Sequence, residues 1–391
     1  MRRLATLLAA AALALLLAPL DAAAIPAFAR KYRVSCTTCH APFPRLKPYG
    51  EAFAGRGFAM EPAQEPARAT VDGGDELLKL PRELPLAIRV DAFGDWGPQE
   101  DPQVQQQAPW IFKLLTGGQV ADGVSWYGYF IIERGEVVGL EDAYVQLSSV
   151  FGLPVDLLFG QFTVSDPLVK RELRLTRLDY DVLTVRPGAS DLDLTYDRGL
   201  MAAWHAPGEV ELVAALVNGA GIGPCQERAC DPDRYKNGML RVTRAFGPVR
   251  LGAFGYLGKQ LKEVAAGSPM VNTTWVAGPD VAVALGDRAT LTAAWLERRD
   301  SNALFLPSGW KETATHGGFA ELVVLPQGEN GRVALVALYN RVDSDDDAAD
   351  RHSAALAAGW LYARNVRLVA EAQRDLEADA WRFSVGTVLA Y

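Results

Sequence analysis

The stretch WRFSVGTVLAY, Trp381–Tyr391, ends the chain and alternates in chemical character with a period of two. Its odd positions are mostly aromatic or aliphatic, whereas Arg382, Ser384 and Gly386 occupy even positions. Successive side chains of a β-strand point to opposite faces, so this pattern predicts one apolar and one polar face. The preceding stretch VRLVAEAQ, 366–373, alternates in the same way. Both stretches predict strands that separate two different environments.

Segments of roughly ten residues with this alternation, or with β-branched and aromatic enrichment, recur between turn residues along the chain. Strand cores are expected at 84–96, 108–119, 124–134, 139–149, 154–164, 193–206, 209–219, 236–246, 249–259, 270–285, 288–299, 315–325, 331–342, 350–363, 365–377 and 380–391. The chain is therefore predicted to be all-β. A soluble β-sandwich would show the same alternation, so the connections must separate the two architectures.

These connections favour a transmembrane barrel. Short ones at 121–123, 206–209, 286–288 and 363–365 alternate with longer polar ones, as outer-membrane barrels alternate tight periplasmic turns with long outer loops. An even strand count returns the C-terminus to the periplasm, and an aromatic last residue is common in such barrels. The sequence predicts an outer-membrane antiparallel β-barrel of about sixteen strands over residues 84–391, with membrane lipid around it.

The N-terminus has the parts of a secretory signal. Arg2 and Arg3 precede an apolar run over 4–17, and small residues at 22–24 provide an exit site. The alternative is a membrane anchor, but the run is shorter than the ~20 apolar residues of a spanning helix. We expect residues 1–24 to be a signal peptide. The net charge of −8 and the lack of a basic stripe interleaved with aromatics exclude a nucleic-acid partner.

The chain has 4 cysteines, and two of them form the motif Cys36-Thr37-Thr38-Cys39-His40. Covalent attachment of haem c needs two thiols for the porphyrin vinyl groups and an adjacent imidazole for the iron. On a helical turn Cys36 and Cys39 share one face, and His40 follows directly. A thioredoxin-like CxxC would need a βαβ context and a zinc site a second ligand pair, and the sequence shows neither. We expect one covalent haem c, with Cys36 and Cys39 as thioether positions and His40 as the proximal ligand.

The haem-binding segment is expected at residues 25–60, and a linker rich in Pro, Ala, Glu and Asp at 61–83. So short a segment cannot build a cytochrome core of its own, so packing from the barrel is expected. Met60 is the candidate distal ligand, because no other methionine of the mature chain precedes Met201. An open or water-filled position stays possible, as does ligation by one of the other histidines, His205, His316 and His352.

The longest internal connection, 165–190, carries a basic cluster. Its basic residues outnumber Glu172 and are Lys170, Arg171, Arg174 and Arg177. The third loop of sixteen-stranded porins folds inward, and EDAYVQL at 141–147 with FGQF at 159–162 resembles the phosphate-selective porin pattern. This resemblance implies a basic constriction that faces anions or haem propionates. An ordinary charged surface helix is the alternative.

Cys225 and Cys230 lie in another expected outer loop, in GPCQERACDP. In an exported protein a local disulfide is the expected use of such a pair. Metal binding is the alternative.

The stretch from Ile25 to Met60 resembles the head of the fused cytochrome–porin family, the outer-membrane monohaem iron oxidases and their relatives. The shared elements are Phe28-Ala29-Arg30, the CxxCH motif, Phe43-Pro44, Gly50, Ala52-Phe53, Gly57-Phe58 and Met60. The resemblance implies one c-type haem on a short helical segment, a sixteen-stranded barrel after it, and electron transfer through the outer membrane. The dipeptide Ala41-Pro42 after the motif differs from the sequence of the iron-oxidising members. The resemblance therefore supports haem attachment more strongly than it supports the identity of the electron donor.

The leading hypothesis is an electron-transfer protein with a haem inside or at the mouth of the barrel. It would pass electrons from an extracellular donor such as Fe(II) to a periplasmic c-type cytochrome or another periplasmic carrier. Whether it acts as an iron(II):cytochrome oxidoreductase or only as a carrier stays open. The main alternative is an anion-selective porin whose haem segment is a plug or sensor, and a third is a soluble periplasmic haem protein.

Overall fold

The computed structural model describes residues 27–391 except 61–69, 76–77, 79, 226–229 and 264–268. The expected signal peptide, 1–24, lies outside the described residues. None of the described helices is long and apolar enough to cross a membrane.

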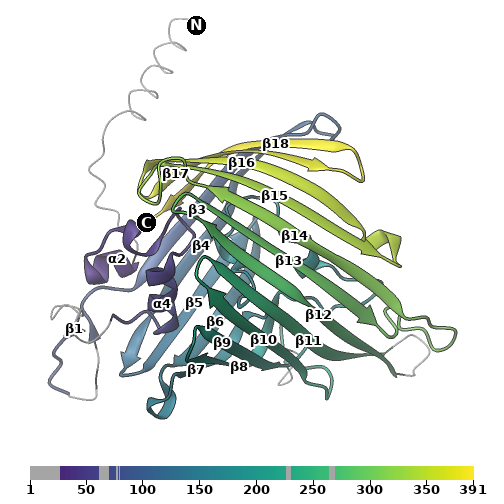
Figure 1. The fold of residues 1–391 in the computed structure, drawn as a ribbon, viewed down its shortest axis with the longest axis horizontal. Helices are drawn as coiled ribbons and strands as arrows, with labels where there is room; N and C mark the ends of the chain where they lie inside the picture. The colour runs from purple at the N-terminus through teal and green to yellow at the C-terminus, as the bar shows by residue number, and fades with distance from the viewer. Residues whose placement is uncertain (1–26, 61–69, 76–77, 79, 226–229, 264–268) are drawn as a thin grey trace, which may run out of the picture.

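Sixteen antiparallel strands, β3 to β18, form one closed barrel in which β18 pairs with β3 (Figure 1). Their bounds are β3 Leu86–Trp96, β4 Val104–Ala121, β5 Val124–Glu133, β6 Glu136–Leu147, β7 Val155–Thr163, β8 Tyr196–Ala206, β9 Val210–Val217, β10 Asn237–Phe246, β11 Val249–Glu263, β12 Pro269–Leu285, β13 Ala289–Asp300, β14 Thr313–Val324, β15 Val333–Ser344, β16 Arg351–Ala363, β17 Val366–Asp375 and β18 Ala380–Ala390. All sixteen expected strands are therefore confirmed, and closure removes the unpaired edges that a sandwich would keep.

The two faces of the barrel follow the alternation of the sequence. On β18, Val385 is 67% exposed on the outside, whereas Ser384 is 1% exposed in the lumen. The outer face carries further exposed apolar side chains, including Leu240, Leu251, Leu257, Trp275, Trp295, Leu335, Leu356, Trp360 and Leu368. Ionisable side chains buried in the lumen include Asp91, Lys113, Arg241, Arg298, Glu321, Arg367 and Glu371. An apolar outside and a polar inside are the reverse of a soluble protein and suit a barrel embedded in lipid.

The connections differ at the two ends. At the end where β18 finishes and β3 begins, called here the short-turn end, several connections have two or three residues, as at 122–123, 247–248 and 364–365. Longer ones, such as 218–236 and 301–312, lie at the opposite, long-loop end. The expected alternation has exceptions: 148–154 and 325–332 lengthen the short-turn end, and 134–135 is a tight turn among the long loops.

Three short helices, α2 (Ala27–Tyr32), α3 (Cys36–Cys39) and α4 (Pro48–Gly55), lie at the short-turn end. Figure 1 shows α2 and α4 beside the C-terminus and the starts of β3 and β5. Arg30 Nη2 donates to the carbonyl oxygen of Leu86 at 2.5 Å, and the Phe58 ring lies 5.0 Å from that of Tyr127. The stretch expected to be a linker contains a two-stranded ribbon, β1 (Thr70–Val71) paired with β2 (Leu80–Pro81).

The connection between β7 and β8 folds into the barrel and is called here the lumenal loop, 164–195. It carries η2 (Arg171–Leu173) and α5 (Asp181–Thr184). Its buried apolar residues, Val164, Leu168, Tyr180, Val182, Leu183, Val185 and Leu194, join one cluster with lumen-facing side chains of β8 to β16. Burial of this apolar surface holds the loop in place, so the loop fills one side of the lumen.

Two further one-turn helices complete the elements. They are η1 (Val150–Gly152) between β6 and β7 and η3 (Asp347–Ala349) between β15 and β16. The latter meets the lumenal loop, because Asp346 accepts a hydrogen bond from Gly188 N at 2.6 Å.

Candidate functional site

The CxxC part of the motif forms the single helical turn α3. Ser35 caps the turn, since its hydroxyl oxygen accepts a hydrogen bond from Thr37 N at 3.4 Å. Cys36 and Cys39 are reduced and partly exposed, three positions apart on this turn. Burial raises the pKa of both thiols above the usual range. The turn therefore presents two protonated thiols on one side, as double thioether attachment requires.

His40 follows the turn with one ring nitrogen engaged. Its Nδ1 lies 2.7 Å from the carbonyl oxygen of Pro44 and 3.3 Å from that of Arg45. Burial lowers the pKa of His40, and this outweighs the opposing effect of the two carbonyls. The imidazole is therefore neutral with its proton on Nδ1, which leaves Nε2 as a lone-pair donor. A metal-ligating histidine commonly has this arrangement, because the carbonyl fixes the tautomer and the ring plane.

Met60 lies in a small apolar cluster with Tyr32 and Phe53. Cys39 packs against the same cluster, as do Phe28 and Phe58. The fold therefore places Met60 and Cys39 in contact with one apolar cluster, although the two are far apart along the segment. Its role as distal ligand stays a prediction.

The alternative histidine ligands lie on the barrel. His205 is at the short-turn end of β8, where Nε2 is 3.2 Å from Asp156 Oδ2. His316 and His352 lie near the long-loop ends of β14 and β16. The eight residue steps from His316 to Val324 span about 26 Å along β14, given ~3.3 Å per residue. Both histidines therefore lie toward the end of the barrel opposite the CxxC turn.

One salt bridge joins the haem-binding segment to the lumen wall. Arg45 Nη2 contacts Glu321 Oε2 on β14 and lies 3.1 Å from the hydroxyl oxygen of Tyr180. The Tyr180 hydroxyl also donates to Glu321 Oε1 at 3.1 Å. Glu321 and Tyr180 are each 0% exposed. Residues from three distant parts of the chain thus meet at one buried carboxylate.

Weaker contacts hold other parts of the segment. Lys47 Nζ lies 3.3 Å from Glu329 Oε2 in the connection between β14 and β15. Arg367 of β17 donates from Nη1 to the carbonyl oxygen of Phe43 at 3.2 Å. Gln146 donates to the carbonyl oxygen of Gly55. These contacts come from strands around the barrel, so the segment covers the short-turn mouth.

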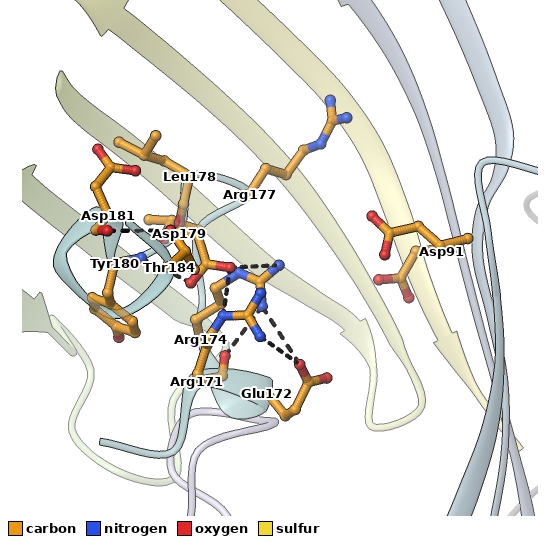
Figure 2. A network of polar contacts seen from close by, with 12 residues as sticks. Asp91, Arg171, Glu172, Arg174, Arg177, Leu178, Asp179, Tyr180, Asp181 and Thr184 are labelled. Carbon is orange, nitrogen blue, oxygen red and sulfur yellow. Dashed lines mark hydrogen bonds and ion pairs between the residues drawn. The ribbon is translucent and has the colours of Figure 1, made fainter. Parts of the chain in front are cut away.

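The basic residues predicted for the constriction lie on the lumenal loop, where carboxylates neutralise them (Figure 2). Arg171 Nε lies 2.8 Å from Asp179 Oδ2, and Arg174 Nη1 lies 4.0 Å from Glu172 Oε1. Lys170 Nζ lies 3.9 Å from Glu51 Oε2 of α4. Nearby acidic groups, Asp179 first among them, raise the pKa of Arg171 despite its burial.

Arg177 reaches from the loop to the opposite wall of the barrel. It contacts Asp95 and donates to Gln107 Oε1 at 2.9 Å. Its guanidinium lies 4.5 Å from the ring centroids of both Phe93 and Trp110. Figure 2 shows Arg177 pointing away from the Arg171–Glu172 group, so this side chain fastens the loop across the lumen.

A cavity of about 200 Å3 remains between the lumenal loop and the wall formed by β3, β4, β5, β17 and β18. Seven basic and five acidic side chains line it; the basic ones are Arg89, Lys113, Arg134, Arg171, Arg174, Arg177 and Arg367. No residue of the described haem-binding segment lines the cavity. The CxxCH motif therefore lies outside this cavity, at the mouth of the barrel.

Cys225 and Cys230 form a disulfide with a Cα–Cα distance of 4.1 Å, in the connection between β9 and β10. Within the described residues no group of three or more His, Cys, Asp or Glu side chains is arranged to hold a metal ion.

Sequence reasoning missed Glu321 and Arg367 as functional candidates. Period-2 alternation does place Glu321 and Arg367 on the lumen side of their strands. It does not show which lumenal side chains meet the N-terminal segment, because that depends on the closed barrel.

No protein-family model matches the chain, and no curated protein matches its sequence. Solved structures do match. OmpT, an outer membrane protein of Vibrio cholerae, has a TM-score of 0.55 at 12% identity, over 82% of this chain and 99% of that chain. Salmonella typhi OmpF in complex with daunomycin has a TM-score of 0.54 at 9% identity, over 80% of this chain and 98% of that chain.

At these identities the likeness shows the fold, a porin-like closed barrel of the outer-membrane type. The expected fold class is confirmed. Neither structure is described as a cytochrome, so the relationship to fused cytochrome–porins stays a prediction.

Proposed function

We propose that this chain is an outer-membrane protein that carries one covalent c-type haem at the periplasmic mouth of its barrel and transfers electrons there. The observation that carries the proposal is the state of His40, whose Nδ1 is held by the Pro44 carbonyl while Nε2 is available. The two reduced thiols of Cys36 and Cys39 precede it on a capped helical turn. This donor set fits haem c and fits a zinc site poorly, because no further ligand group is assembled near it in the described residues.

Several residues of the segment would each make a different contact with the haem. Cys36 and Cys39 would tether it, and His40 Nε2 would bind the iron, since the contact of Nδ1 with the Pro44 carbonyl fixes the ring plane. The rings of Phe28, Phe53 and Phe58 would exclude water from one side, since Phe28 and Phe58 stack with centroids 4.7 Å apart. A bound haem c supplies one-electron transfer at its iron.

The position of the segment favours a periplasmic electron partner. Outer-membrane barrels place their short turns on the periplasmic side, and the segment lies at the short-turn end beside the C-terminus. A soluble periplasmic cytochrome or another periplasmic carrier could approach the motif there. An extracellular donor such as Fe(II) is the corresponding source of electrons, and its electrons would have to cross a lumen of which the loop fills one side.

The test is haem loading and reduction in the full chain. Co-expression with a haem c maturation system should give a low-spin c-type spectrum that His40→Ala abolishes and His205→Ala leaves unchanged. Heat-modifiable electrophoretic mobility checks that both variants form the barrel. A wild-type barrel that folds without covalent haem contradicts the proposal, as does a normal low-spin spectrum in His40→Ala.

A second candidate function is an anion-selective channel closed by the segment, because basic side chains outnumber acidic ones in the lumenal cavity. Reconstitution in a planar bilayer under a KCl gradient tests it. An anion-selective reversal potential supports a channel. A conductance indistinguishable from the bare bilayer, in both wild type and a variant lacking 27–60, contradicts it.

A further inference from the structure

Arg367 differs from the other basic residues that line the lumenal cavity. Each of the other six has a carboxylate within 4.0 Å: Asp91 for Arg89, Glu172 for Lys113 and Arg174, Glu133 for Arg134, Asp179 for Arg171 and Asp95 for Arg177. Among the described residues Arg367 has no ion pair, although it is only 7% exposed. Its single hydrogen bond goes from Nη1 to the Phe43 carbonyl, and its buried Nε has no partner.

The register of the barrel explains why no carboxylate reaches Arg367. Arg367 pairs with Val388 on β18, and Val388 pairs with Asp91 on β3. Two strand spacings of ~4.8 Å separate Arg367 from Asp91, with an apolar side chain between them. Both carboxylate oxygens of Asp91 also accept hydrogen bonds from Arg89, at 2.9 and 2.6 Å. The nearest carboxylate in this row of paired strand residues is therefore already paired with another arginine.

A second carboxylate lies on β17 itself but is also engaged. Glu371 accepts hydrogen bonds from Arg177 N at 2.6 Å, Leu178 N at 3.0 Å and Gln373 Nε2 at 2.5 Å. It fastens the lumenal loop to the wall, so Arg367 faces the cavity as an uncompensated buried cation. A buried guanidinium without an anion is unfavourable, and its planar fork matches an oxyanion well.

We propose that Arg367 is the anchor of an oxyanion site for a carboxylate or phosphate group. The site lies where the lumenal cavity approaches the haem-binding segment, at the contact of Arg367 with Phe43. Arg174, Arg177 and Trp110 line the same cavity, and each has a buried side-chain nitrogen without a hydrogen-bond partner, Nε in the two arginines and Nε1 in Trp110. A volume of about 200 Å3 suits a small anion and excludes a whole porphyrin. The lining as a whole has seven basic and five acidic side chains, and Arg367 makes the direct contact.

The oxyanion has two possible sources, a free solute in the lumen or a propionate arm of the attached haem reaching past Phe43. The site itself does not rest on haem attachment, since cavity and guanidinium are present in the chain alone. A double variant, Cys36→Ser with Cys39→Ser, cannot attach haem and separates the two sources.

Thermal unfolding and calorimetric titration of the full chain with sodium phosphate, and separately with succinate, test the site in haem-loaded and double-variant proteins. The matched control is Arg364→Gln, in the turn just before β17, three positions earlier and exposed to solvent. In haem-free protein, phosphate or succinate should raise the unfolding midpoint and bind at least about tenfold more weakly to Arg367→Gln. Arg364→Gln should behave as the parent protein does.

The haem-loaded protein then identifies the source. Equal anion binding with and without haem indicates a free solute. Binding only without haem, together with a shifted haem midpoint potential in Arg367→Gln, indicates a propionate. Both results support an oxyanion site at Arg367. The proposal is overturned if Arg367→Gln and its parent bind both anions equally, or if Arg364→Gln lowers binding to the same extent. Failure of haem loading alone leaves the haem-free titration valid, so the two proposals fail separately.

Discussion

Arg45, five residues after the CxxCH histidine, forms a salt bridge with Glu321, a fully buried lumenal carboxylate 276 positions later in the chain. The same carboxylate accepts the hydroxyl hydrogen of Tyr180 on the lumenal loop. One anion thus connects the haem-binding segment, the loop that fills the lumen and the barrel wall.

Replacement of Arg45 should release the segment from the mouth. Arg45→Gln leaves Glu321 buried without a cation, and loss of one partner of a buried pair costs about 3–5 kcal/mol. We expect faster limited proteolysis of the segment and a higher single-channel conductance. Lys47→Gln, whose partner Glu329 is 48% exposed, should change both by little, because surface pairs contribute ~0–1 kcal/mol. Equal effects of the two variants would show that the buried bridge has no special role.

Gly50 should be essential for the geometry of the motif. A Cβ at Gly50 would lie 2.3 Å from the carbonyl oxygen of Cys39, so alanine must push α4 away from the CxxC turn. We expect Gly50→Ala to reduce the covalent haem per folded barrel severalfold, measured by the pyridine haemochrome spectrum. Gly55→Ala, in the same helix, meets nothing within 4 Å and should leave haem loading unchanged. Normal loading in Gly50→Ala would mean that the turn does not require this close approach.

A charge on the outer face should disturb membrane insertion according to its depth. Val385 lies in the middle of β18 on the apolar face, and arginine near the bilayer midplane costs about 2–4 kcal/mol. We expect Val385→Arg to lower the free energy of unfolding in phospholipid vesicles by that amount. Trp381→Arg, near the end of the same strand, should cost ~0–1 kcal/mol. Similar costs at both positions would argue against a lipid-facing β18.

Arg177 should hold the lumenal loop against the far wall. Lysine keeps the charge but cannot reproduce the planar guanidinium that packs against the rings of Phe93 and Trp110 and donates to Gln107 and Ser384. We expect Arg177→Lys to destabilise the folded barrel by about 2 kcal/mol in denaturant titration.

The control for this change is Arg186→Lys, in the same loop, whose side chain is 53% exposed where it pairs with Asp193. It should cost less than ~1 kcal/mol. If the two lysine variants are equally stable, the contacts of Arg177 across the lumen do not fasten the loop.

The architecture was accessible from the sequence because it depends on local periodicity. Alternation along Trp381–Tyr391 predicted which side chains face outward, and the structure shows Val385 outside and Ser384 inside. Connection lengths were less predictable. The tight turn at 134–135 and the long connection at 325–332 break the expected alternation, since loop length alone does not identify the end of the barrel.

The candidate site also has some features that follow from local sequence and others that depend on the tertiary structure. The sequence by itself determined the sixteen strands, their two faces and the CxxCH motif, because each rests on residues close together in the chain. Only the tertiary structure decided that Arg45 meets Glu321, that the basic loop residues are neutralised by neighbouring carboxylates, and that Arg367 is left without one. The physical reason is barrel closure: pairing β18 with β3 sets every lumenal neighbour across the bore, and no local pattern encodes those distances.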